Sequence, residues 1–163
     1  VRQVSELNAV RAGLLPAAGD PDVDRLIDAT RRVQALVDRG LDEDPLAFFA
    51  AAEAAREQLG AEQLAASLFQ AYADSDPETP WVGKALLAAH AASADPVQRA
   101  ALARRIAGLV GNPYVRYARG DDVGNALAPL ERVLDERLGV LQAQVRADLA
   151  ARRQLLVPDT TGG

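Results

Sequence analysis

The chain has 163 residues, with 18 lysine and arginine residues against 23 aspartate and glutamate residues, and its net charge is −5. This length suits one domain with a real hydrophobic core, and a charged fraction of 25% argues against a disordered chain. Cysteine is absent, which excludes disulfide bonds, thiolate metal sites and thiol catalysis. The single histidine, His90, excludes any multi-histidine metal site.

The composition favours helices. Alanine, the best helix former, dominates residues 50–55 and 88–94, whereas β-branched Ile and Thr are scarce. Lys84 is the only lysine, and this excess of arginine is typical of a GC-rich bacterial genome. No apolar run has the length of a membrane span and no signal peptide is visible, so we expect a cytoplasmic protein. Because the chain begins at Val1, we allow for a preceding targeting signal or domain.

Proline marks the starts of the expected helices. A proline at the first helical position needs no N–H, and a preceding Asp, Thr or Asn can cap the free N–H groups of the first turn. This pairing occurs at Asp20-Pro21, Asp44-Pro45, Thr79-Pro80, Asp95-Pro96 and Asn112-Pro113, and Asp76-Pro77 is a sixth, just before the third. Gly40, Gly60 and Gly111 follow amphipathic stretches, as residues that end helices do.

In chain order, these proline and glycine positions predict helices over residues 2–15, 21–39, 45–59, 62–74, 80–93, 96–110 and 122–156, with a short helical turn over 113–119. Trp81 is expected to anchor the start of its helix against the core and to need a partner for its N–H. The sequence therefore predicts one all-α domain over residues 1–156, a bundle of six to seven helices with a long C-terminal helix. Residues 157–163 are expected to form a flexible tail.

The last helix has the clearest pattern. Its apolar residues recur in steps of three and four that average about 3.67 per turn, which predicts a nearly straight helix rather than a heptad coiled coil. About 35 residues would span roughly 50 Å, which is longer than the other helices can cover. We therefore expect a non-enzymatic interaction or adaptor domain that self-associates, or binds another protein, through this helix. The predicted interface consists of Leu134, Leu138, Leu141, Val145 and Leu149.

Residues 112–122 concentrate side chains suited to recognition. Tyr114, Arg116, Tyr117 and Arg119 form a possible recognition patch, because tyrosine and arginine bind partners and anions with little loss of entropy. The structural alternative is that Asp121 or Asp122 caps the last helix while the two tyrosines pack beneath it.

No residue set predicts a catalytic site, a cofactor or a metal centre. Asp20, Asp22 and Asp24 alternate like the start of a calcium loop, but the required glycine and glutamate are absent, so they fit a capped helix start better. Carboxylate pairs such as Glu53 with Glu57, Asp24 with Asp28 and Glu131 with Asp135 have arginine neighbours and fit solvated faces. We interpret His90 as structural.

The charge is divided unevenly along the chain. Residues 1–95 hold eight basic and sixteen acidic residues, and residues 96–163 hold ten basic and seven acidic ones. We favour attraction between the two parts within one bundle, and a nucleic-acid partner is not expected because the excess of positive charge is small.

Two other functions stay open. The chain can be a small-molecule-binding effector domain of a bacterial regulator, or, with less support, a metal-dependent all-α phosphohydrolase that uses the carboxylate pairs.

Overall fold

The computed structural model describes residues 20–156, and within that range it contains seven α-helices and no strand. The predicted all-α fold is therefore confirmed, whereas the expected helix over residues 2–15 and the tail after residue 156 lie outside the described residues. The helices are α2 (Pro21–Asp42), α3 (Leu46–Leu59), α4 (Glu62–Ser75), α5 (Trp81–Ala92), α6 (Pro96–Gly108), α7 (Pro113–Ala118) and α8 (Leu127–Leu156).

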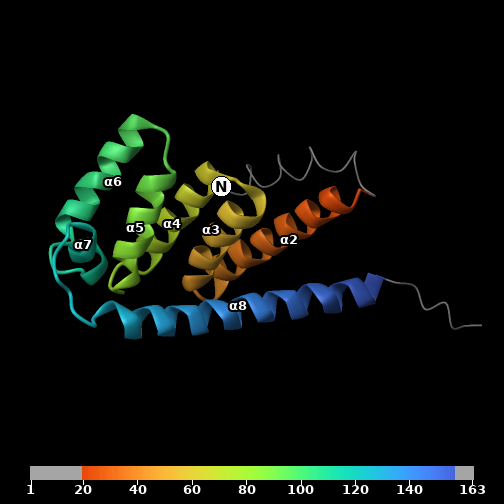
Figure 1. Ribbon diagram of the computed structural model, residues 1–163. Helices are drawn as coiled ribbons and strands as arrows, with labels where there is room; N and C mark the ends of the chain where they lie inside the picture. Colours follow the sequence, from red (N-terminus) through yellow and green to blue (C-terminus); the bar gives the residue numbers. More distant parts are fainter. Residues whose placement is uncertain (1–19, 157–163) are drawn as a thin grey trace, which may run out of the picture.

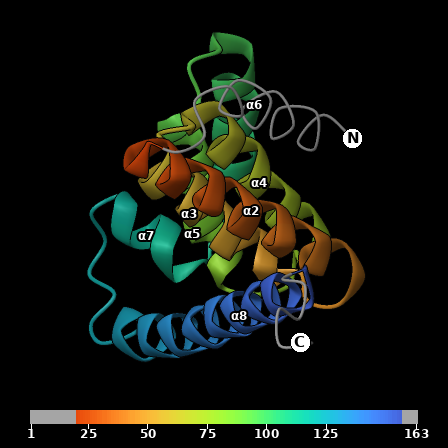
Figure 2. The same ribbon diagram turned by 90° about the vertical axis from the view of Figure 1, so that its right-hand side faces the viewer.

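Helices α2 to α5 form a row in which each packs against the next (Figure 1). The long helix α8 runs along one side of this row and contacts α2 and α3. Figure 2 shows from a second direction that α8 lies along one side of the row. The short helix α7 packs against α5, and α6 follows α5 at the far end of the row.

The core is centred on the alanine-rich helix α3. Every residue of the run 46–52 is buried, and small side chains there let the neighbouring helices approach closely. Phe49 makes edge-to-face contacts with Phe69 at 5.1 Å and Tyr72 at 5.5 Å between ring centroids, which joins α3 to α4. The hydroxyl of Tyr72 bonds that of Thr79 at 2.5 Å, so its burial leaves no polar group unpaired.

Four of the five caps predicted at the helix starts are present. The side chains of Asp20, Asp44, Asp95 and Asn112 accept hydrogen bonds from backbone N–H groups two residues ahead, at 2.8 to 3.0 Å. Thr79 is the exception, because its hydroxyl bonds Tyr72 and the Asp76 carbonyl rather than the start of α5.

Gly60 ends α3 with φ at +60°, as predicted, but the other two expected helix ends are wrong. Gly40 lies inside α2, where a Cβ atom would meet the ring of Phe48 at 2.9 Å, so its role is close packing. Gly111 lies beyond α6, which already ends at Gly108 so that Leu109 can turn back onto the core.

The last helix begins later than predicted. The Asp122 carboxylate accepts a hydrogen bond from the N–H of Gly124 at 2.9 Å, and Gly124 has φ at +56°, so this segment forms a turn rather than a helix. Helix α8 begins at Leu127, which places Pro129 in its first turn, where no backbone hydrogen bond is lost.

Candidate functional site

The inner face of α8 is covered by its own chain. Leu134, Leu138, Leu141 and Val145 are at most 5% exposed, and Leu149 is half-buried against the same core. The premise that the bundle is too short to cover this stripe is therefore wrong for these residues. The reason is that α2 and α3 lie alongside the middle of α8 and supply the opposing apolar surface.

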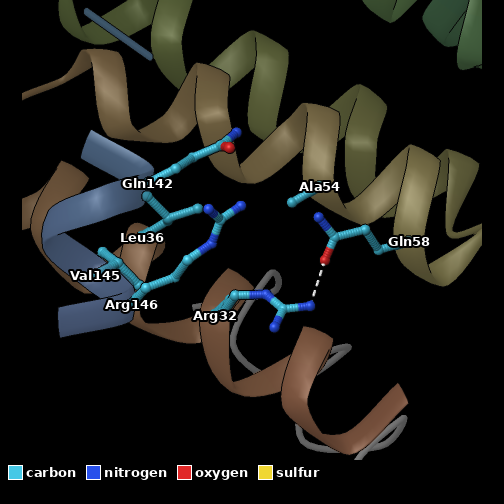
Figure 3. Close-up of a pocket in the computed structure, with 7 residues that line it drawn as sticks. All are labelled: Arg32, Leu36, Ala54, Gln58, Gln142, Val145 and Arg146. Carbon is cyan, nitrogen blue, oxygen red and sulfur yellow. Dashed lines mark hydrogen bonds between the residues drawn. The ribbon is translucent and has the colours of Figure 1, made fainter. Parts of the chain in front are cut away.

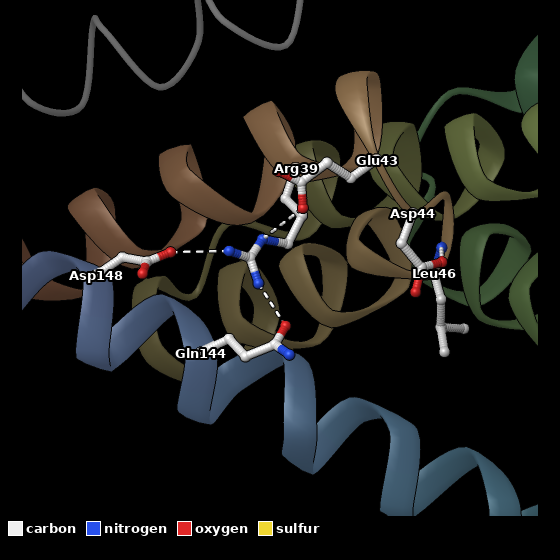
Figure 4. A network of polar contacts seen from close by, with 6 residues as sticks. All are labelled: Arg39, Glu43, Asp44, Leu46, Gln144 and Asp148. Carbon is white, nitrogen blue, oxygen red and sulfur yellow. Dashed lines mark hydrogen bonds and ion pairs between the residues drawn. The ribbon is translucent and has the colours of Figure 1, made fainter.

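Polar side chains fasten α8 to the row of helices. Arg39 of α2 is only 16% exposed and binds Gln144 and, at 2.8 Å, Asp148 of α8, besides Glu43 just after the end of α2 (Figure 4). On either side of this contact along α8, Arg137 lies 3.7 Å from Asp44 and Arg153 binds Asp28 at 2.7 Å.

These bonds support an attraction between the two parts of the chain. The pairs of Arg153 with Asp28, Arg137 with Asp44 and Arg105 with Asp74 each join an arginine after residue 95 to an aspartate before it.

On the opposite side of α8, beside the exposed Arg132, runs a stripe with few charges, which we call the outer face. It consists of seven exposed residues in steps of four and three: Pro129, Val133, Glu136, Val140, Ala143, Ala147 and Ala150. This is heptad spacing throughout, whereas the buried stripe departs from it between Val145 and Leu149, which are four residues apart. Val133 is 42% and Val140 is 56% exposed, and Glu136 is the only charged member. Valine and alanine thus stand where a solvated helix normally carries charge.

The predicted recognition patch does not form one surface. Tyr114 is buried and only 7% exposed, whereas Tyr117 is 64% exposed. Arg116 lies 3.5 Å from Asp121, and Arg119 donates to the carbonyl of Ala107 at 3.4 Å. The six-residue helix α7 turns Tyr114 inward and leaves Tyr117 exposed, so only one of the two tyrosines packs inside as the structural alternative expected. Neither Asp121 nor Asp122 caps α8.

Lys84, the only lysine, is the centre of a polar cluster between α5 and α8. Its ammonium binds both carboxylate oxygens of Glu131, at 2.7 and 2.8 Å, and lies 5.9 Å from the centre of the Tyr114 ring. Trp81 donates its N–H to the Leu130 carbonyl at 3.2 Å, which confirms its predicted anchoring role, and Arg137 covers its ring at 5.4 Å.

Acidic groups in and near the cluster have shifted pKa values. Burial would raise the pKa of Glu131, but the neighbouring side chains of Lys84 and, to a smaller extent, Tyr114 outweigh burial and hold that pKa below its ordinary value. Burial, followed by the charge of Glu57, raises the pKa of Glu53. Burial, followed by the neighbouring Glu131 carboxylate, raises the pKa of Tyr114. The paired lysine and glutamate bind each other, which fits a structural role better than acid–base chemistry.

The proposed carboxylate pairs do not assemble into a metal centre. Within residues 20–156, no three or more His, Asp or Glu residues are arranged to hold a metal ion. Asp28 is bound by Arg31 and Arg153, and Glu131 is bound by Lys84. His90 lies half-buried near the end of α5.

A second group of polar side chains lies between α2, α3 and α8. Arg32 and Arg146 line one small pocket together with Gln58, Gln142 and the apolar side chains of Leu36, Ala54 and Val145 (Figure 3). Arg32 donates to Gln58 at 2.8 Å, while its Nε is buried without a partner among residues 20–156. Across the described residues, no hydrogen bond or ion pair holds Arg146. The pocket thus brings together two cations and no carboxylate.

A larger groove of about 410 Å³ adjoins this pocket, and the two share Arg32 and Gln58. Leu26 and Ala29 of α2 form its apolar wall. Another groove, of about 380 Å³, lies between the loops before α5 and before α7, and five of its eleven lining residues are proline or glycine.

No protein-family model matches the chain, and no curated protein and no solved structure is significantly similar to it. None of the helices between residues 20 and 156 combines the length and the apolar character that a membrane span requires.

Sequence reasoning missed the two polar clusters because each gathers residues far apart in the chain. Lys84 and Glu131 are 47 positions apart, and Arg32 and Arg146 lie on helices α2 and α8. The one available signal was that Lys84 is a lone lysine among arginines, and we did not interpret it as functional.

Proposed function

We propose that the chain is a protein-interaction domain that pairs with a second copy of itself through the outer face of α8. The observation that carries this proposal is the exposure of Val133 and Val140 on a heptad-spaced face with one charged residue. The leucine stripe that the sequence predicts as the interface is buried in the core. We therefore place the proposed contact on the opposite side of the same helix.

The spacing of the outer face suits an antiparallel pair. If the two-fold axis passes between Leu141 and Gln142, Val140 lies opposite Ala143 of the second copy, and Val133 lies opposite Ala150 of that copy. Each larger side chain then meets a smaller one, as interdigitating helices require. A two-fold pair is also the commonest arrangement of homo-oligomers. The outer face from Pro129 to Ala150 provides a contact about 33 Å long.

Light scattering tests the proposal. The unmodified chain should be a dimer at tens of micromolar, and its melting temperature should rise with protein concentration. Val140→Lys and Val133→Lys should give monomers with unchanged helix content, because a lysine in the contact would stay buried and unpaired. Val97→Lys is the matched control, because Val97 is 78% exposed on α6, outside this face. A monomeric unmodified chain would rule out the proposal.

A further inference from the structure

We infer that the pocket between α2, α3 and α8 is a binding site for a phosphate group, held by Arg32 and Arg146. The inference is independent of the self-association proposed above, because these arginines line a pocket on the inner side of α8 rather than its outer face. It would give the chain a ligand, as the effector-domain alternative requires.

The first argument is the charge balance of the pocket. Two guanidinium groups line it, and its remaining walls are two glutamine amides and three apolar side chains, without a carboxylate. Other arginines near α8 are paired with a carboxylate, as Arg39 is with Asp148 and Arg153 is with Asp28, although Arg132 and Arg152 have no such pair within residues 20–156. Like charges that share a partly buried pocket repel each other, so an anion bound between them would be strongly favoured.

The second argument is the set of free donors. The buried Nε of Arg32 has no acceptor in the part of the chain that the structure describes, although its Nη2 donates to Gln58 at 2.8 Å. Arg146 reaches the same pocket from α8 and has no hydrogen bond or ion pair within residues 20–156 (Figure 3). A phosphate carries about two negative charges at neutral pH and several acceptor oxygens, which matches two guanidinium groups.

The space available requires a movement of Arg146. The cavity of about 10 Å³ holds no more than about one water molecule. Arg146 is exposed, so its side chain can move aside at little cost to admit an anion and then fold over it. Arg32 stays in place because it is bonded to Gln58. The adjoining groove of about 410 Å³ gives room beside Arg32 for the organic part of a phosphate ester.

Binding is tested by titrating the unmodified chain with inorganic phosphate, and separately with phenyl phosphate, at ionic strength matched with chloride. We expect saturable binding by calorimetry and a shift of the Arg32 Nε resonance in the nitrogen NMR spectrum. Arg146→Gln should weaken binding at least about tenfold, because one of two charge-assisted contacts is lost. Arg132→Gln removes the same charge from an exposed position of α8 that does not line the pocket and should leave the affinity unchanged.

The two probes distinguish the source of the phosphate group. Tighter binding of phenyl phosphate identifies an ester that uses the adjoining groove, and equal affinities identify free phosphate. The inference is overturned if phosphate binds no better than chloride, if the Arg32 resonance does not move, or if Arg146→Gln and Arg132→Gln bind alike. Arg146 is exposed, so its substitution does not threaten the fold and the test stays decisive.

Discussion

The amide group of Asn112 occupies the space in which a Cβ atom of residue 83 would lie, so Gly83 and Asn112 are matched across the contact between α5 and α7. The Asn112 amide donates to the Pro80 carbonyl at 2.8 Å, and its oxygen accepts from the N–H of Tyr114 at 3.0 Å. One side chain therefore caps α7 and ties it to the start of α5. The glycine is needed here for space rather than for its backbone conformation.

Gly83→Ala should destabilise the protein by about 1–3 kcal/mol, because the methyl group displaces Asn112 and so breaks its hydrogen bonds to Pro80 and to the first turn of α7. Urea denaturation measures the loss. Gly139→Ala is the control, since nothing lies within 4 Å of a Cβ atom there, and it should stabilise α8 by about 0.5–1 kcal/mol. Equal stabilities of the two variants would contradict the contact.

The two faces of α8 should respond differently to truncation. Leu141→Ala should cost about 2–5 kcal/mol, because this leucine is 5% exposed and its loss leaves a cavity. Val140→Ala, at a position that is 56% exposed, should change the stability of the folded monomer by less than about 0.5 kcal/mol. Chemical denaturation at low protein concentration separates the two, and a large effect at Val140 would mean that the inner and outer faces are misassigned.

The pair of Lys84 and Glu131 should stabilise the fold at neutral pH. The pKa of Glu131 is lower in the folded chain than its ordinary value of 4.5, so its contribution is present above that value and is lost as the pH falls through the lowered pKa. Glu131→Gln should therefore cost about 1 kcal/mol or less at pH 7, since the pair is partly solvated. The difference from the unmodified chain should disappear in acid.

A double-mutant cycle with Lys84→Gln isolates the contribution of this pair. If the losses caused by Glu131→Gln and Lys84→Gln simply add, the two side chains do not stabilise each other.

Two of the three tyrosines should keep their protons until the chain unfolds in alkali. Burial raises the pKa of Tyr72 to about 12, and it also raises the pKa of Tyr114. The unfolded chain releases these protons near pH 10, so the free energy of unfolding should fall as the pH rises above about 10. Ultraviolet absorbance of tyrosinate, followed together with circular dichroism, checks this. Tyr72→Phe should reduce the dependence on pH, and early titration of all three tyrosines would contradict the burial.

The proline-associated caps should differ in their effect. Asp95→Ala and Asp44→Ala should each cost about 0.5–2 kcal/mol, because each carboxylate accepts a bond from the first turn of its helix at 3.0 Å. Thr79→Ser should cost less, because the hydroxyl that binds Tyr72 is kept and no helix loses a cap. Thermal melts of the three variants test the ranking, and unchanged melting temperatures for both aspartate variants would remove the capping argument.

The sequence by itself determined the class of fold and most helix boundaries among residues 20–156. Alanine content, Asp-Pro and Asn-Pro pairs and apolar spacing are local signals, and helix starts depend on local hydrogen bonds such as that of Asp95. Sequence reasoning failed where a distant residue decides. Gly40 lies inside a helix, where Phe48 packs against it. Thr79 does not cap α5, because its hydroxyl is bonded to Tyr72.

Only the tertiary structure decided which side of α8 is free. Periodicity shows that a helix has an apolar face, but it cannot show whether that face meets the same chain or another one. The packing of α2 and α3 along α8 assigned Leu134 to Val145 to the core and left Val133 and Val140 outside. The same packing brought Arg32 and Arg146 to one pocket. Contacts between residues more than a hundred positions apart depend on how helices are placed in space, and no local pattern encodes that placement.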